Sequence, residues 1–581
     1  MSTKIESNYI VERTKNYQYP AYSEEKGVKK VVAFGDHSHK CPVYTLRIPP
    51  CTAGCPSGED IRSYLNLLRG IEKSKNKWEA AWRKIVDKNP FPAVMGRVCP
   101  HPCESKCNRQ FHDENISINA VEHAIGEYGL QNNLSFEKPT IKTSKHIAVI
   151  GGGPAGLSAA YQLARKGHKV TIYEAQDKLG GMIRYGIMRY RVNREVLEKE
   201  INRILDLGIE VKTNFRIGKD ISLDELKKKH DAVFIGVGAQ KGRNIPIPGF
   251  DGANQTINSI DFLMEFEKKG ESMQIGKQVL VIGDGNVAMD VARLALRLGS
   301  QAAVVSGVPK NEMACFPEEF DDAVNEGTNF HLQIGSIEVI RNGNKVKSLK
   351  CTKMQKKEKG EEGWNSSIPF LRYKPIIGTE FVIECDMIVS AIGQSTDMAG
   401  LESIANNANW LQVDSNYKVK GMDGVFGGGD AIKIDLITTA IGHGNKAAKA
   451  IDDYINSKTP PPSEYQDIIP YEKLHPNSFL PSSKVKRKHL KIDSIIGNYS
   501  ETIKSLDQDS VIKEAGRCMS CGLCFECNQC LLFCPQGAIS KFKFNPIGEV
   551  MFTDYNMCIG CHLCADICPT GYIRMGMGED L

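Results

Sequence analysis

Two repeated cysteine runs near the C-terminus constrain this chain more than any other feature of its sequence. Each run follows C-x2-C-x2-C-x3-C-P, and the runs close at Pro535 and Pro569. In two-cluster bacterial ferredoxins each run gives three thiolates to one 4Fe-4S cluster and its fourth thiolate to the other. The spacing therefore predicts two clusters, one held by Cys524, Cys527, Cys530 and Cys568 and the other by Cys558, Cys561, Cys564 and Cys534. A zinc site is the alternative. Cys518 and Cys521 extend the first run at the same spacing, either as spare thiols or as a register alternative, and they are excluded from the ligands because only the run ending at Pro535 has the closing proline.

A second group of cysteines lies near the N-terminus and consists of Cys41, Cys51, Cys55, Cys99, Cys103 and Cys107. The chain has 581 residues and 19 cysteines, and short-spaced groups in so large a chain indicate metal ligation rather than disulfides. Six thiolates cannot complete two four-ligand clusters. We therefore expect either one N-terminal cluster with spare thiols or two clusters with some ligands other than cysteine.

The middle of the chain contains a glycine-rich turn. Residues 146–150 form an apolar run of strand length that leads into a G-x-G-x-x-G motif and then into a helical stretch. The glycines allow a tight turn, a close approach of the backbone to a pyrophosphate, and tight packing of helix on strand. Glu174 ends the next strand, where a carboxylate can accept hydrogen bonds from a ribose. The predicted dinucleotide contacts are Gly151, Gly153, Pro154, Ala155, Gly156 and Glu174.

A distant segment indicates that the dinucleotide at this turn is FAD. Residues 424–430 resemble the glycine-aspartate motif of flavoproteins with two dinucleotide-binding folds, in which the aspartate holds the ribityl chain of the flavin. Gly429 and Asp430 occupy those positions here. The residues that follow, among them Thr439, lead into an alanine-rich helix, whose N-terminal dipole would stabilise negative charge on the reduced flavin.

A second glycine-rich turn repeats the order of strand, turn and helix, and it predicts the nicotinamide site. The turn contains Gly283, Gly285, Asn286, Val287 and Ala288. The end of the following strand, from Ser306 to Lys310, has neither a carboxylate for the ribose of NADH nor an arginine pair for the phosphate of NADPH. Lys310 alone is a poor substitute for that pair, so this strand end favours NADH.

These motifs predict an α/β fold with nested FAD- and NAD(P)-binding domains of the two-dinucleotide-binding type, flanked by iron-sulfur domains. The expected domains are an N-terminal helical iron-sulfur domain (1–143), an FAD-binding domain (144–275 and 385–458), an NAD(P)-binding domain (276–384), a linker (459–514) and a ferredoxin-like domain with two 4Fe-4S clusters (515–581).

Residues 40–455 resemble the glutamate synthase small-subunit family. The resemblance is carried by residues 96–107, GRVCPHPCESKC, and by residues 116–122, ISINAVE. It implies one cluster held by Cys55, Cys99, Cys103 and Glu122, and a second held by Cys41, Cys51 and Cys107. The family has two closely spaced cysteines where this chain has only Cys41, so the fourth ligand of the second cluster stays open, with His37 or His39 as options. Residues 180–187 resemble the flavin-side segment of the family, which implies flavin contacts by Gly181 and Arg184.

The ferredoxin tail and residues 39–44 and 49–51 resemble the iron-sulfur flavoproteins that work with dissimilatory sulfite reductase. This likeness implies an NAD(P)H:acceptor oxidoreductase whose protein partner is dissimilatory sulfite reductase, in sulfur metabolism. The alternatives are an electron donor of the glutamate synthase type, an NAD(P)H:ferredoxin-type oxidoreductase, and a non-catalytic electron-transfer scaffold. No catalytic side chain is expected, because the flavin itself carries the hydride transfer.

Composition and cysteine placement argue against other classes of protein. The net charge of +5 is small for this length, and no stretch approaches the roughly 18 apolar residues of a membrane span. We therefore expect no nucleic-acid partner, no membrane span and a cytoplasmic location, and a homodimer is an open option. A disulfide reductase would need a C-x-x-C pair beside the flavin, and the sequence has none between Cys107 and Cys518.

Overall fold

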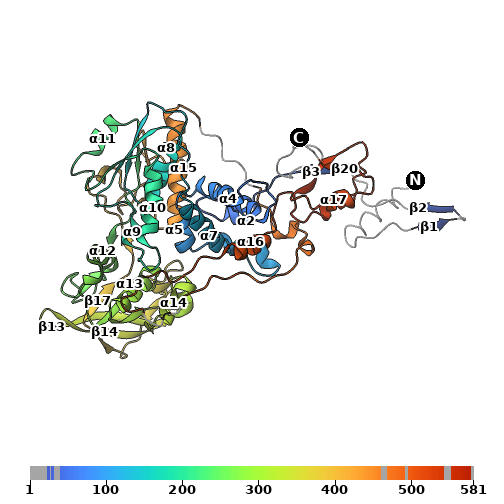
Figure 1. The fold of residues 1–581 in the computed structure, drawn as a ribbon. Helices are drawn as coiled ribbons and strands as arrows, with labels where there is room; N and C mark the ends of the chain where they lie inside the picture. The colour runs from blue at the N-terminus through green and yellow to red at the C-terminus, as the bar shows by residue number, and fades with distance from the viewer. Residues whose placement is uncertain are drawn as a thin grey trace.

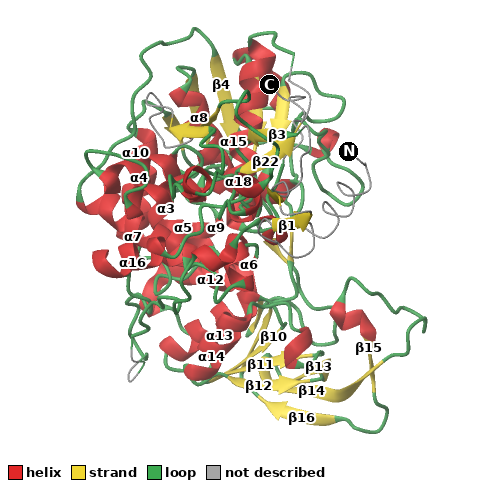
Figure 2. Cartoon of the chain, turned by 90° about the vertical axis from the view of Figure 1, so that its right-hand side faces the viewer, coloured by secondary structure: helices red, strands yellow, loops and turns green. Residues whose placement is uncertain are grey.

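The computed structural model describes residues 22–25, 28–31, 40–459, 467–490, 492, 495–541 and 551–576. These residues form a helical domain, two parallel sheets flanked by helices, and a small module of short helices and strands near the C-terminus (Figure 1). Figure 2 shows the sheet that contains β10, β11 and β12 in a lobe of its own, below the rest of the chain. The predicted α/β fold with two dinucleotide-binding sheets is confirmed.

The helical domain packs around buried aromatic side chains such as Trp82, which is fully buried. Asp60 and Asn76 cap two of its helices, since their side chains accept hydrogen bonds from the backbone N–H groups of Ser63 and Glu79. Its helices are α2 (Pro50–Ala53), α3 (Ile61–Arg69), α4 (Lys77–Val86), α5 (Pro92–Val98), α6 (Pro102–Ser105), η1 (Asn108–Phe111) and α7 (Ile118–Gln131).

The first sheet is parallel and has the strand order β19-β7-β4-β5-β6. Its strands are β4 (His146–Ile150), β5 (Lys169–Tyr173), β6 (Glu210–Lys212), β7 (Ala232–Ile235) and β19 (Val425–Gly427). Its helices are α8 (Pro154–Arg165), α9 (Met182–Tyr185), α10 (Arg194–Leu205), α11 (Leu223–Lys229) and α15 (Ile437–Ile455). Because β19 joins the sheet from far along the chain, the second domain is inserted into the first, as the motifs predict.

The second sheet is also parallel, with the order β12-β11-β10-β17-β9. Its strands are β9 (Thr256–Asn258), β10 (Gln278–Ile282), β11 (Gln301–Ser306), β12 (Asn329–Leu332) and β17 (Met387–Ser390), and its helices are α12 (Ser259–Lys269), α13 (Asn286–Arg297) and α14 (Pro317–Asn325). An antiparallel sheet follows β12 and contains β13 (Ile334–Asn342), β14 (Lys345–Lys356), β15 (Tyr373–Pro375) and β16 (Phe381–Glu384). The expected domain limits at 275/276 and 384/385 assign β9 and β17 to the FAD-binding domain. Both strands instead pair within this second sheet, so those limits cut through it.

The two lobes are joined by a short antiparallel pair, β8 (Lys241–Gly242) and β18 (Gln394–Ser395). Short 3-10 helices lie along the loops of the chain: η2 (Gly270–Ser272), η3 (Lys310–Glu312), η4 (Pro369–Arg372), η5 (Glu402–Ile404), η6 (Gly429–Ala431), η7 (Tyr471–Lys473) and η8 (Pro476–Ser478). A further antiparallel pair is formed by β1 (Tyr22–Glu25) and β2 (Val28–Val31).

The C-terminal module contains α17 (Gln529–Leu532), β20 (Ile539–Lys541), β21 (Met551–Thr553), α18 (Leu563–Asp566) and β22 (Ile573–Gly576). Strand β3 (Cys41–Tyr44) pairs antiparallel with β22, so a segment from the N-terminal part of the chain completes this module. Helix α16 (Gln508–Gly516) lies ahead of the module and packs on α3 and α7 of the helical domain. The described part of the expected linker is therefore docked on the protein surface rather than detached from it.

Candidate flavin and cluster sites

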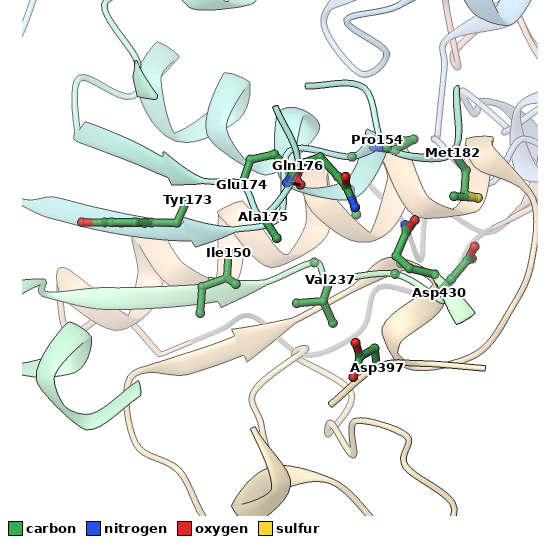
Figure 3. A pocket seen from close by; sticks show the side chains of 18 of the residues that line it. Ile150, Pro154, Tyr173, Glu174, Ala175, Gln176, Met182, Val237, Asp397 and Asp430 are labelled. Atoms are coloured by element: carbon green, nitrogen blue, oxygen red, sulfur yellow. Dashed lines mark hydrogen bonds between the residues drawn. The ribbon is translucent and has the colours of Figure 1, made fainter. Parts of the chain in front are cut away.

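A pocket with about 1120 Å³ of empty space, open solvent included, lies beyond the ends of β4, β5 and β7 (Figure 3). Its glycine-rich turn needs residues without a side chain. Gly151 has φ 96°, and a Cβ at Gly156 would lie 1.9 Å from the carbonyl oxygen of Gly151. Gly153 faces Gly181 across the turn, with a built Cβ 3.6 Å from the Gly181 Cα. The backbone of the turn is thus left uncovered for a bound phosphate.

Three acidic side chains line this pocket, and two of them lie well apart along it, Glu174 near Gln176 and Asp430 near Met182; the third is Asp397 (Figure 3). The Glu174 carboxylate accepts hydrogen bonds from the Gly152 N–H at 2.6 Å and the Gln176 N–H at 2.8 Å, so the strand end fixes its position. Burial raises the pKa of Glu174 and raises the pKa of Asp430 to about 6. Both positions fit carboxylates that accept hydrogen bonds from sugar or ribityl hydroxyls.

Not every predicted flavin contact lines the pocket. Among the described residues that line it, Gly151, Gly153, Pro154, Ala155, Glu174, Gly181, Gly429 and Asp430 are present, while Gly156, Arg184 and Thr439 are not. Arg184 is buried, with Nε donating to the Leu179 carbonyl at 2.5 Å and the guanidinium pairing with Glu198 at 2.7 Å. Arg184 thus holds the loop that carries Gly181, and it does not face the ligand space.

The second glycine-rich turn follows β10. Gly283 has φ 149°, and a Cβ there would lie 2.4 Å from the Ala391 carbonyl oxygen, while the space around Gly285 is open. Asn286, Val287 and Ala288 begin α13, and the Asn286 side chain accepts a hydrogen bond from the Phe316 N–H at 2.9 Å. At the end of β11, Ser306 is buried and bonded to Val308, and Lys310 pairs with Asp321 at 3.1 Å. The open space around Gly285 therefore leaves the N-terminus of α13 uncovered.

A cavity with about 320 Å³ of empty space lies in the helical domain, and we call it the helical-domain cavity. Four of its lining residues are Cys55, Cys99, Cys103 and Glu122. Tyr64 also lines it, and within the described chain its buried hydroxyl has no hydrogen-bond partner, as expected of a donor that faces a bound group. Burial raises the pKa of Cys55 to about 12, so these thiols need an attached cation to ionise at neutral pH.

A second carboxylate, Glu59, lines the helical-domain cavity and was missed from the sequence. One Asn89 amide donates to Glu59 at 2.9 Å and to Glu122 at 3.0 Å. Burial raises the pKa of Glu59 to about 7 and raises that of Glu122 well above its usual range. Glu59 directly precedes the helix cap Asp60, a position that gives no sign of burial in the sequence.

Two similar cavities lie in the C-terminal module, with about 330 and 340 Å³ of empty space. One is lined by Cys524, Cys527, Cys530 and Cys568, and the other by Cys534, Cys558, Cys561 and Cys564. Each cavity thus receives one cysteine from the opposite run, which is the crossed arrangement that the spacing predicts. No three Cys, His, Asp or Glu side chains of the described chain converge on a single-ion site, and these four-residue sets instead surround spaces large enough for a cluster.

The remaining N-terminal cysteines differ from their expected grouping. Cys41 lies on β3 beside Cys558, because the pairing of β3 with β22 carries it onto the C-terminal module. Cys51 instead has the thiols of Cys107, Cys518 and Cys521 as its neighbours, and burial beside them raises its pKa well above the usual range. The expected set of Cys41, Cys51 and Cys107 is therefore not formed, and His37 and His39 lie outside the described residues.

The fold and these sites define a flavoprotein of the two-dinucleotide-binding class with iron-sulfur domains at both ends. Residues 145–444 match the pyridine nucleotide-disulphide oxidoreductase family, residues 27–134 match dihydropyrimidine dehydrogenase domain II with a 4Fe-4S cluster, and residues 517–572 match the 4Fe-4S dicluster domain. The chain belongs to the glutamate synthase small-chain family of these oxidoreductases. Its cofactors are FAD, NAD(P)H and 4Fe-4S clusters in the N- and C-terminal regions.

Three relatives illustrate the range of this family. The chain is 33% identical over 446 residues to the NADP(+)-dependent formate dehydrogenase subunit beta of Moorella thermoacetica, covering 72% of this chain and 62% of that protein. It is 32% identical over 517 residues to the NADPH-Fe(3+) oxidoreductase subunit beta of Geobacter sulfurreducens, covering 81% and 75%. It is 31% identical over 437 residues to the small chain of glutamate synthase [NADPH] of Bacillus subtilis, covering 70% and 86%. The chain thus spans less than two thirds of the formate dehydrogenase subunit.

No described helix is both long enough and apolar enough to cross a membrane.

Proposed function

We propose that this chain passes electrons between NAD(P)H and a redox protein partner, through FAD and its 4Fe-4S clusters. One observation carries this proposal: the flavin pocket and the helical-domain cavity meet at the first turn of α15. Ile437 and Ala440 line the flavin pocket, and Thr438 between them lines the helical-domain cavity. A group in the cavity would therefore lie one helical turn from the flavin.

The residues of the flavin pocket bind and orient the cofactor rather than react. The uncovered backbone at Gly151 and Gly153 receives the pyrophosphate, Glu174 the adenosine ribose and Asp430 the ribityl chain. When bound there, FAD would supply hydride chemistry toward a nicotinamide, and bound 4Fe-4S clusters would supply one-electron transfer. The N-terminus of α15 points its dipole at this pocket and stabilises negative charge there.

The cluster ligands in this proposal are those that line the three cavities. Cys55, Cys99, Cys103 and Glu122 hold one cluster in the helical domain, and the two crossed cysteine sets hold two clusters in the C-terminal module. Support comes from the cysteine-rich donor sets that line the three cavities, which suit iron. A disulfide reductase is disfavoured, because the flavin pocket has no cysteine among its lining residues in the described chain.

The redox partner is proposed to be a protein that works together with this chain in a larger enzyme. The sequence resemblance favours dissimilatory sulfite reductase, whereas the relatives' names include subunits of a formate dehydrogenase, an Fe(3+) oxidoreductase and a glutamate synthase. All of these names describe subunits or chains of larger enzymes, which supports a protein partner for this chain as well. The exposed Leu532 and Phe533, between the third and fourth cysteines of the first run, give the C-terminal module an apolar surface for such contact.

Anaerobic reduction of the holoprotein by NADH and by NADPH tests this function. We expect bleaching of the flavin absorbance, followed by electron paramagnetic resonance (EPR) signals from reduced clusters. The strand end at Ser306 to Lys310 favours NADH, whereas the relatives' names carry NADP, so the two rates are compared directly. Reduction of the clusters by dithionite with no response to either dinucleotide would contradict the proposal.

A further inference from the structure

Four cysteines from opposite ends of the sequence, two of them buried and two half-buried, lie together outside the three cavities described above. They are Cys51, Cys107, Cys518 and Cys521, and we call them the interdomain cysteine group. Cys51 lies on α2 and Cys107 directly precedes η1, whereas Cys518 and Cys521 lie between α16 and the C-terminal module. The helical-domain cavity and the two cavities of the C-terminal module each have four proposed ligands. The interdomain cysteine group also has four.

We propose that the interdomain cysteine group ligates a fourth 4Fe-4S cluster, which joins the helical domain to the C-terminal module. Cys518 and Cys521 then replace the two closely spaced N-terminal cysteines that this chain lacks. Ligation replaces the four thiol protons with iron–sulfur bonds and releases those protons to water. No other described cysteine is required, and Cys41 is left as a spare thiol beside Cys558.

The segment that carries Cys518 and Cys521 is fixed to the helical domain at nearly every residue. Arg69 donates to the Cys518 carbonyl, and Arg62 donates to the Cys521 carbonyl at 2.8 Å. Between them, the Ser520 hydroxyl donates to the Asn66 side chain at 2.7 Å. Such fixed positions are what a cluster requires, because its ligands must be held within a fraction of an ångström.

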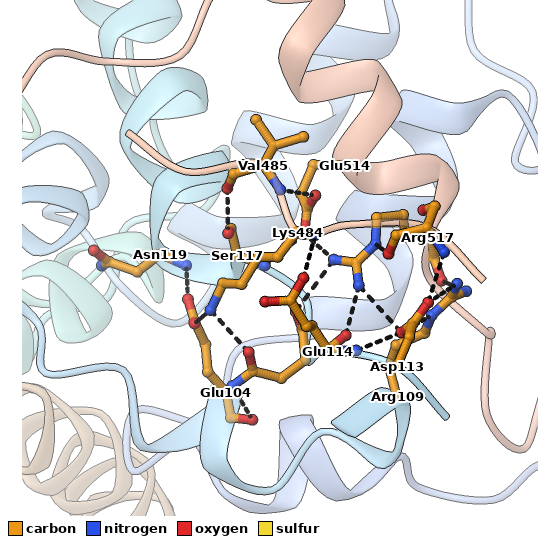
Figure 4. A network of polar contacts seen from close by, with 12 residues as sticks. Glu104, Arg109, Asp113, Glu114, Ser117, Asn119, Lys484, Val485, Glu514 and Arg517 are labelled. Atoms are coloured by element: carbon orange, nitrogen blue, oxygen red, sulfur yellow. Dashed lines mark hydrogen bonds and ion pairs between the residues drawn. The ribbon is translucent and has the colours of Figure 1, made fainter. Parts of the chain in front are cut away.

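The helix before this segment is anchored just as firmly (Figure 4). Arg517 is buried and donates to Glu514 at 2.7 Å, to Asp113 at 3.2 Å and to the Glu114 carbonyl at 2.6 Å. Arg109, in turn, donates to the Arg517 carbonyl at 2.5 Å. This network holds Arg517, and with it the adjacent Cys518, against the helical domain.

The surroundings of the interdomain cysteine group suit an anionic cluster. Asn108 points its amide at the Cys521 sulfur, with Nδ2 and Sγ 3.8 Å apart, and hydrogen bonds to sulfur are a common way to tune such clusters. Arg62 Nε and Asn66 Nδ2 are buried donors with no acceptor among the described residues. Cations and unpaired donors would favour the negative charge that four thiolates bring.

This site also fills a gap in the path of the electrons, an argument that rests on the proposed function. Cys51 and Cys55 are four residues apart in the sequence, as are Cys103 and Cys107, so the Cα atoms of these paired ligands of the site and the helical-domain cavity lie at most about 14 Å apart. Cys521 and Cys524 are three residues apart, at most about 11 Å. A fourth cluster would therefore have a neighbour on each side, one in the helical domain and one in the C-terminal module.

Iron and sulfide analysis of the anaerobically purified holoprotein tests the site. Four clusters correspond to about sixteen irons per chain and three clusters to about twelve. We expect about sixteen for the natural chain and for Cys41→Ala, and about twelve for the double variant Cys518→Ala/Cys521→Ala, with unchanged FAD content as the check on folding. About twelve irons in the natural chain, or loss of four irons in Cys41→Ala, would overturn the proposal. If the double variant fails to fold, the iron contents of the natural chain and of Cys41→Ala still test the proposal.

EPR after reduction by NAD(P)H then tests the role of the site. In the double variant we expect flavin bleaching as in the natural chain, but loss of signals from the C-terminal clusters until dithionite is added. Reduction of those clusters by NAD(P)H at the natural rate would overturn the relay role. If the natural chain itself does not bleach with NAD(P)H, the proposed function fails, and the iron count still decides the site.

Discussion

The flavin pocket and the interdomain cysteine group are assembled from very different stretches of chain. In the flavin pocket, the glycine-rich turn at residues 151–156 directly joins one strand to one helix, and Glu174 follows the next strand. The interdomain cysteine group joins Cys51 to Cys521, and their meeting depends on the path of the described residues between 467 and 517 across the helical domain. A site made by local backbone geometry is therefore readable from a motif, whereas a site made by tertiary docking is not.

The largest effect is expected where the local site is broken. Gly156→Ala places a Cβ 1.9 Å from the Gly151 carbonyl oxygen, so the turn must open and FAD should be lost almost completely. Flavin content of the purified protein measures this. The matched variant Gly285→Ala has open space around its new Cβ, so it should keep FAD and weaken only NAD(P)H binding. Equal flavin content in the two variants would show that the first turn does not hold FAD.

The second largest effect is expected at the interdomain cysteine group, when the side chain that anchors its C-terminal segment is removed. Arg517→Met leaves the buried Glu514 carboxylate without its cation, which should destabilise the docking by about 3–5 kcal/mol. We expect faster proteolysis between residues 467 and 517 and loss of part of the iron, with FAD retained. Lys541→Met is the control, because its pair with Glu526 is half-exposed and should contribute about 1 kcal/mol or less. If both variants resist protease like the natural chain, the network in Figure 4 does not hold the linker.

A smaller effect, dependent on pH, is expected at the junction of the helical and flavin domains. The fully buried Glu200 accepts hydrogen bonds from the Ala93 and Val94 N–H groups at 3.0 Å each, and burial raises its pKa to about 7. Because the folded state binds this proton more tightly than the unfolded state, Glu200 should add stability as pH falls from about 7 toward 4.5, by up to about 1.4 kcal/mol per pH unit.

Thermal unfolding of Glu200→Gln and of the natural chain between pH 5 and pH 8 measures this difference. The variant should lack the extra gain in stability at the acidic end. Glu384→Gln, at an exposed carboxylate on β16, should follow the natural chain. Parallel curves for all three proteins would mean that the Glu200 pKa is not raised.

The smallest effect is expected from a single hydrogen bond to sulfur. Asn108→Leu removes the amide that approaches Cys521, and this bond stabilises the more negative, reduced form of a cluster. Losing it should lower the midpoint potential of one cluster by about 20–60 mV, from about 0.5–1.5 kcal/mol per hydrogen bond. A redox titration followed by EPR detects the shift. Asn115→Ala is the control, since the Asn115 amide donates to the Glu104 carbonyl rather than to a sulfur.

Sequence patterns predicted much of the fold because its main elements have local causes. The two glycine turns each begin a helix directly after a buried strand, and the spacing within the two C-terminal runs brings four cysteines to each of two cavities. The fold class, the family and the kinds of cofactor follow from such patterns and are confirmed. The roles of the individual ligands stay predictions.

The features that sequence reasoning missed depend on contacts between distant segments. β9 and β17 lie far apart in the sequence, yet they pair in one sheet, so the domain limits could not be read from composition. Cys518 and Cys521 were set aside because their run lacks a closing proline, and only the docking of α16 on α3 reveals their neighbours. The family resemblance groups Cys41 with Cys51 and Cys107, whereas the β3–β22 pairing places Cys41 on the C-terminal module.

The most direct test of the whole account is rapid mixing of the oxidised, cluster-loaded protein with NADPH or NADH, with flavin absorbance and freeze-quenched EPR followed together. The account predicts that the flavin bleaches first and that cluster signals, including those of the C-terminal module, then appear without any added mediator. Flavin bleaching that leaves every cluster oxidised would contradict it, because the flavin and the clusters would then not form one electron path.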